Sequence, residues 1–200
     1  MVHASRGLNS MAEVFQGGTL GVIPGTPFLK LLEREYGLGQ MKVVPHDNNI
    51  APFLHDPRMA QQCFISSEPI VARRAGANPQ VFMLKDIGFN PYTGLIITRR
   101  QTLEQHPARV SALVRAVRQG WRAYLADPDP ANRVMHALNP TMAAATFAEA
   151  AIIQKPLIQG QLDDATLGTM TLERWRTLAE QLEDLGLIER AEPEGAFVNP

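Results

Sequence analysis

The 200-residue sequence contains a single cysteine, Cys63, and no apolar run near the roughly 20 residues that a membrane-spanning helix needs. One cysteine excludes an internal disulfide and a metal site built from several thiolates. Lys and Arg number 19 and Asp and Glu number 20, so the net charge is -1. Without an excess of basic residues, the composition gives no electrostatic reason to expect nucleic acid as a partner.

The sequence also lacks the common catalytic signatures. It has no G-x-S-x-G elbow, Walker loop, G-x-G-x-x-G or H-E-x-x-H motif. Its histidines are scattered, and His46 and His55 stand beside Asp47 and Asp56. A histidine in a loop next to Pro or Asp is more often a turn residue than a metal ligand. We therefore expect no enzyme activity, no metal site and no cofactor.

The first half of the chain alternates short apolar runs with helix signals. This pattern predicts strands near 19–23, 41–45, 62–66 and 81–84, with helices over 27–36, 49–54 and 69–74 between them. A further short strand is predicted at 95–98. Such alternation is typical of an α/β fold, with a parallel, doubly wound sheet covered by helices on both faces.

The second half is predicted to be helical. A long amphipathic helix begins at Pro107 and ends before the DPDP segment at 127–130, and further helices are expected near 131–138, 141–154 and 171–185. The apolar faces of these helices need another layer to pack against, and this half supplies almost no strands. Either the helices form a bundle of their own, or part of the protein is absent.

Polar loops follow three of the predicted strands. They are Gly25-Thr26-Pro27, Asp47-Asn48-Asn49 and Ser66-Ser67-Glu68-Pro69. Each loop precedes a helix, so capping alone explains any one of them. In open α/β sheets, however, ligands bind beyond the carboxyl ends of the strands, where helix N-termini present free N–H groups. Three such loops at one edge predict a cleft for a small hydrogen-bonding ligand.

Four segments of the first half of the chain occur in this order: GTLGVIPGTP at 18–27, KVVPHD at 42–47, AQQCFISSEP at 60–69 and GFNPY at 88–92. Taken together, they resemble the NMT1/THI5-like family of substrate-binding proteins of ABC importers. The later segments GTMTLERW at 168–175 and LGLI at 185–188 are also similar to that family's C-terminal region. The resemblance therefore spans nearly the whole chain.

The resemblance implies a two-lobed, type II periplasmic binding protein-like fold with the ligand between the lobes. On that template, residues 1–4 are the crossing strand, 5–93 the second α/β lobe and 94–200 the mainly helical remainder of the first lobe. The opening part of the first lobe and a secretion signal would be absent. The implied partners are a small-molecule ligand and an ABC permease subunit. The implied location is the periplasm, or the cytoplasm if Met1 is the genuine start.

The resemblance also assigns the ligand and its contacts. Thiamine pyrimidine precursors are bound in this family, and an aminopyrimidine suits the carboxylate of Glu68. The remaining predicted contacts are Gly25, Thr26, Asn48, Ser67 and, against the ring, Tyr92. Two alternatives stay open. One is a sulfonate, taurine or nitrate binder, served by helix N-termini and Arg. The other is a pyrimidine synthase relative, which needs pyridoxal phosphate, a lysine, a histidine and a cysteine-rich segment that Cys63 alone does not reproduce.

Overall fold

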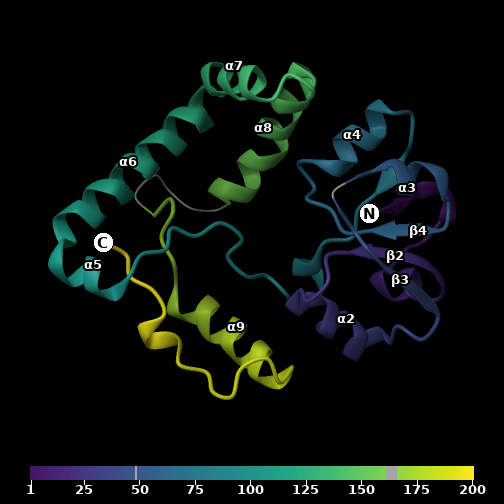
Figure 1. The fold of residues 1–200 in the computed structure, drawn as a ribbon, viewed down its shortest axis with the longest axis horizontal. Helices are drawn as coiled ribbons and strands as arrows, with labels where there is room; N and C mark the ends of the chain where they lie inside the picture. Colours follow the sequence, from purple (N-terminus) through teal and green to yellow (C-terminus); the bar gives the residue numbers. More distant parts are fainter. Residues whose placement is uncertain (48, 161–165) are drawn as a thin grey trace. The chain divides into compact units, whose positions relative to one another are not determined.

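The computed structural model describes residues 1–47, 49–160 and 166–200. The chain folds into two compact units. Unit 1 comprises Met1–Phe89 with Asp184–Leu187, and unit 2 comprises Asn90–Glu183 with Ile188–Pro200. Unit 1 contains the sheet, whereas none of the described residues of unit 2 forms a strand (Figure 1).

The sheet of unit 1 is mostly parallel. Within the described residues it has five strands in the order β3-β2-β4-β1-β5. The central strand β2 pairs in parallel with β3 on one side and β4 on the other, while β1 is antiparallel to both β4 and β5. The strands are β1 Val2–His3, β2 Gly18–Val22, β3 Met41–Pro45, β4 Met59–Gln61 and β5 Pro79–Gln80. The α/β fold class is confirmed, with a sheet of the kind found in periplasmic binding proteins.

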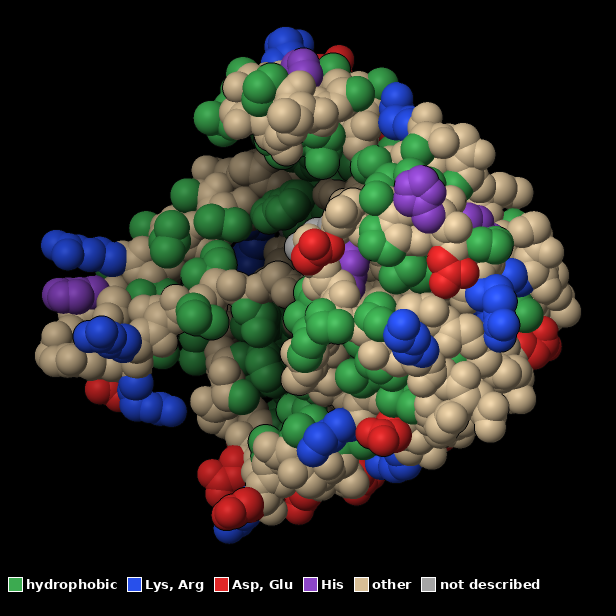
Figure 2. All heavy atoms as spheres, turned by 45° about the vertical axis from the view of Figure 1, so that its right-hand side comes forward, with side chains coloured by type: hydrophobic (Ala, Val, Ile, Leu, Met, Phe, Trp, Pro, Cys, Tyr) green, Lys and Arg blue, Asp and Glu red, His purple; other side chains and the backbone are tan. Residues whose placement is uncertain are grey.

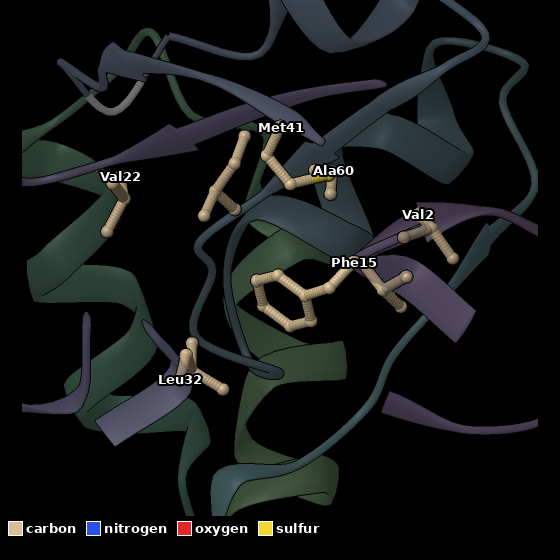
Figure 3. Close-up of a cluster of buried hydrophobic side chains, with 8 residues drawn as sticks. Val2, Phe15, Val22, Leu32, Met41 and Ala60 are labelled. Carbon is tan, nitrogen blue, oxygen red and sulfur yellow. The ribbon is translucent and has the colours of Figure 1, made fainter. Parts of the chain in front are cut away.

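Helices cover both faces of this sheet, as the alternating pattern predicts. On one face, α2 (Pro27–Tyr36) and α1 (Met11–Val14) pack on Leu20 and Val22 of β2. Figure 3 shows Phe15, Val22 and Leu32 among the labelled side chains of this cluster. On the other face, α3 (Ala51–His55) and α4 (Glu68–Arg74) contribute Phe53 and Ala72, which pack with Met59 of β4. Successive strand residues point to opposite faces, so Ala60 of β4 packs in the first cluster and Met59 in the second.

The prediction of a third strand at 62–66 is wrong. The strand is Met59–Gln61 and begins three residues earlier, and residues 62–66 form irregular chain that runs into a turn before α4. The apolar run Cys63-Phe64-Ile65 resembles a buried strand, but the side chain of Phe64 is 56% exposed. Its backbone N–H bonds to the carboxylate of Glu68, and its carbonyl oxygen accepts from the Ser67 N–H. Those two bonds turn the chain into α4 and remove it from the ladder.

Two further strand predictions fail for lack of a partner. Instead of a strand at 81–84, β5 covers only Pro79–Gln80, and a 3₁₀ turn occupies Leu84–Ile87. This edge strand pairs only with the two residues of β1, which limits its length. Residues 95–98, predicted as a strand, have no regular structure, and Ile97 is 87% exposed.

Unit 2 is built from helices that bury little apolar surface among the described residues. Its buried hydrophobic side chains there are Leu125, Ala151 and Leu167, while Leu138 and Ile152 lie exposed. α7 packs on α8 and α5 on α6. The helices are α5 Arg100–Gln105, α6 Pro107–Ala126, α7 Asp129–Leu138, α8 Ala144–Gln159 and α9 Leu172–Asp184. None of the described helices combines the length and the apolar character that crossing a membrane requires.

This contrast in packing predicts unequal local stability. Amide hydrogens in 131–160 should exchange faster than those in 19–84, because few buried apolar contacts oppose opening of α7 and α8. Hydrogen exchange followed by mass spectrometry at neutral pH measures this difference. Equally slow exchange in the two segments would show that the helices of unit 2 pack as firmly as the sheet.

A second prediction concerns Gly18 at the start of β2. Its φ is +117°, and a Cβ there would lie 2.5 Å from the backbone oxygen of Arg58. Gly18→Ala should lower the free energy of unfolding by about 1–3 kcal/mol, because backbone rather than a movable side chain blocks the methyl. The matched control is Gly39→Ala, where a Cβ meets nothing within 4 Å and φ is not positive. Urea unfolding should find the control unchanged or slightly more stable. Equal effects at both positions would contradict the steric argument.

Candidate functional site

The carboxyl ends of β2, β3 and β4 lie at one edge of the sheet because the three strands are parallel. Backbone hydrogen bonds join the loops that leave this edge. The His46 N–H donates to the Val22 oxygen at 3.1 Å, and the Gln62 N–H donates to the Gly21 oxygen at 2.8 Å. The Gln62 side chain then accepts from the Ile23 N–H at 2.9 Å. The chain segments that leave the three strands and lead into the polar loops found in the sequence therefore lie side by side.

The loop after β2 holds Gly25 and Thr26. Gly25 is exposed with a φ of +78°, a conformation that favours glycine. Thr26 is the N-cap of α2, and Pro27 occupies the first turn. The Thr26 hydroxyl does not cap the helix; it donates to the Ile23 oxygen at 3.1 Å and closes the preceding turn. Capping therefore does not explain this hydroxyl.

In the loop after β3, the polar side chains accept hydrogen bonds from the loop's own backbone. The Asp47 carboxylate accepts from the Asn49 N–H at 3.1 Å, and the Asn49 side chain accepts from the Ala51 N–H at 2.9 Å. These contacts are Asx turns that lead into α3. Asn48, the predicted ligand contact in this loop, lies outside the described residues.

The loop after β4 ends in a buried carboxylate. Glu68 is 7% exposed, and its Oε2 accepts from the Phe64 N–H at 2.8 Å. Ser67 is the N-cap of α4, but its side chain makes no capping bond. The carboxylate of Glu68 thus closes the 64–68 turn. The sequence predicted only that Glu68 lies at the start of a helix and did not predict this role.

Tyr92 lies in unit 2, whereas Gly25, Thr26, Ser67 and Glu68 lie in unit 1. Its hydroxyl accepts from the Thr171 N–H at 2.8 Å, next to the start of α9. The guanidinium of Arg174 stands over its ring, 4.1 Å from the centroid. Both its polar and its aromatic surface are therefore engaged within unit 2.

Two residues at the edge of the sheet were not among the predicted site residues. Gln61, the last residue of β4, is 2% exposed, and both polar atoms of its side chain lack a hydrogen-bond partner among the described residues. The Nε2 of His46, directly after β3, is likewise buried without a partner there. The sequence signal was the polar pair Gln61-Gln62 among apolar residues. The predicted strand began at residue 62 and therefore left Gln61 out.

On the right-hand part of the face that Figure 2 presents, acidic and basic side chains are interspersed. Over the described part of the chain, no three His, Cys, Asp or Glu side chains come together in a way that would hold a metal ion.

Cys63 lies just after the end of β4. Burial raises the pKa of its thiol. A raised pKa leaves less thiolate at neutral pH, and the thiolate is the reactive form. Cys63 in the native protein should therefore react with Ellman's reagent at pH 7.5 at least about tenfold more slowly than in 6 M urea. Equal rates in the two conditions would mean that the thiol is open and unperturbed.

Together, the mostly parallel sheet and the polar loops at its carboxyl edge define an α/β architecture of the periplasmic binding protein kind. The family model described as NMT1/THI5 like matches residues 1–131, and the chain belongs to that family. No curated protein matches the sequence significantly. The family consists largely of substrate-binding proteins, so membership favours a ligand-binding role.

Proposed function

We propose that this chain is the solute-binding component of an ABC importer and that it captures a small polar ligand, such as a thiamine pyrimidine precursor. The observation that carries the proposal is the edge of the sheet where hydrogen bonds join three polar loops, in a chain of the NMT1/THI5-like family. Binding at such an edge requires no bond to be made or broken. An ABC permease subunit is the proposed protein partner, and the periplasm the proposed location.

Glu68 is the proposed main contact. A carboxylate in a mostly buried position forms strong hydrogen bonds with an exocyclic amine because the bond is charge-assisted. Its Oε2 is held by the Phe64 N–H, which fixes the orientation of the carboxylate. Gly25, Thr26, Asn48 and Ser67 are the proposed secondary contacts from the loops that leave the same edge. Tyr92 is left out of this set because Thr171 and Arg174 already engage it.

Binding is favoured over catalysis by the state of the one cysteine. A synthase of the pyridoxal phosphate type draws on a cysteine-rich segment, and this chain has only Cys63. The raised pKa of its thiol disfavours the thiolate that covalent chemistry needs. A nitrate or sulfonate ligand is the competing assignment, and it leaves the Glu68 carboxylate with its turn-closing bond to the Phe64 N–H alone and no part in ligand binding.

Glu68→Gln tests the assignment. The amide oxygen still accepts from the Phe64 N–H, so the turn should survive while the charge is lost. Affinity for 4-amino-2-methylpyrimidine, measured by calorimetry, should fall by about 1–3 kcal/mol, roughly 5- to 150-fold. The matched control is Glu35→Gln, a surface carboxylate paired with Arg34, which should bind as the wild type does.

Two results would count against the proposal in different ways. Equal affinity of wild type and Glu68→Gln removes Glu68 from the site but keeps the ligand. No heat of binding with the wild type removes the pyrimidine assignment, and the same titration with taurine and nitrate then tests the anion-binding alternative.

A further inference from the structure

Gln61 stands out at the edge of the sheet because its side chain is buried and unpaired at both ends. It is 2% exposed, and its Nε2 and Oε1 have no hydrogen-bond partner among the described residues. The neighbouring Gln62 differs, since its Oε1 accepts from the Ile23 N–H at 2.9 Å. Two adjacent residues with the same side chain thus have opposite hydrogen-bonding states.

After the two atoms of Gln61, the Nε2 of His46 is the third buried side-chain atom without a partner in the described part of unit 1. Gly21 lies between the two side chains. A Cβ placed on Gly21 would be 3.8 Å from Cγ of Gln61 and 3.8 Å from Cβ of His46. In the ladder, Gly21 pairs directly with Gln61 of β4. The side chains of Gln61 and His46 therefore both start beside Gly21, together with the terminal methyl of Met59, on the face of the sheet that α3 and α4 cover.

Such an arrangement is unfavourable in a protein that only needs to fold. A buried carboxamide without partners loses its bonds to water and gains none in exchange. Gln61 also points to the same face as Met59, two residues earlier on β4, where an apolar side chain would pack well. Sequences break local rules of this kind mainly at functional sites.

We infer that Gln61, with His46 beside it, recognises a ligand that carries a hydrogen-bond donor next to an acceptor. A carboxamide presents one donor and one acceptor side by side, and it pairs with an amino group beside a ring nitrogen, as glutamine does with adenine edges. The Nε2 of His46 adds a donor or an acceptor according to its tautomer. This inference rests on the proposed function and specifies the class of ligand.

The same geometry argues against an anion at this site. Nitrate and sulfonates only accept hydrogen bonds, so the Oε1 of Gln61 would stay unpaired beside them. An aminopyrimidine satisfies both atoms. Its amine has two N–H groups, so the Oε1 of Gln61 and the carboxylate of Glu68 can each accept one. A bound water that bridges Gln61 and His46 is the competing explanation, because polar cavities in proteins commonly hold such waters.

The first test needs no ligand. Gln61→Met is close in volume and removes both unpaired atoms, so the melting temperature of the free protein should stay the same or rise. If a bound water satisfies the carboxamide, the substitution breaks those bonds and the melting temperature falls. A fall below the wild-type value overturns the inference.

The second test compares two ligands that differ in one group. Wild type should bind 4-amino-2-methylpyrimidine at least about tenfold more tightly than 2,4-dimethylpyrimidine, in which a methyl replaces the amine. Gln61→Met should lose most of that preference. Gln62→Met is the matched control and should keep it, because Gln62 serves the backbone of Ile23.

The outcomes separate this inference from the proposed function. If wild type prefers the amine and Gln61→Met prefers it equally, the role of Gln61 is overturned while the proposed function stands. If wild type binds neither pyrimidine, the pyrimidine assignment is overturned and this inference with it, and the titrations with taurine and nitrate then test the anion-binding alternative. Loss of preference in Gln61→Met alone, with an unchanged or raised melting temperature, supports the inference.

Discussion

The parallel pairing of β2 with β3 and β4 is the constraint on which the rest of unit 1 depends. It brings the ends of three strands to one edge and so determines where the polar loops leave the sheet. The pairing leaves little room beside β2. A Cβ on Gly18 would lie 2.5 Å from the backbone oxygen of Arg58, so this position requires glycine, whereas a Cβ on Gly21 would displace only the terminal methyl of Met59, 2.6 Å away.

Sequence periodicity predicted what depends on local pattern. The strands at Gly18–Val22 and Met41–Pro45 and the helix at Pro27–Tyr36 lie where apolar spacing, proline and glycine place them. Helix α6 was equally predictable because Pro107 starts it and a long apolar stripe runs along it. The loops after β2 and β3 followed directly, since their positions depend on where those two strands end.

What the sequence could not provide was the environment of single side chains. The apolar run at Cys63-Phe64-Ile65 reads as a strand, but the bond from the Phe64 N–H to Glu68 turns it away from the sheet. Gln61 is polar and reads as a surface residue, yet the pairing of β4 between β2 and β1 buries it. The first is a bond between residues four apart that the apolar run conceals, and the second depends on the pairing of strands distant in the sequence, which no local pattern records.

The position of β1 in the sheet has a consequence for how the chain folds. Val2 pairs with Ala60 on one side and Gln80 on the other, so β1 lies between two strands that come much later in the sequence. Its partners emerge from the ribosome only after most of unit 1 has been synthesised. Closing such long loops is entropically costly and slows folding. We therefore expect β2, β3 and β4 to assemble first and β1 to dock last, as the step that joins β5 to the sheet.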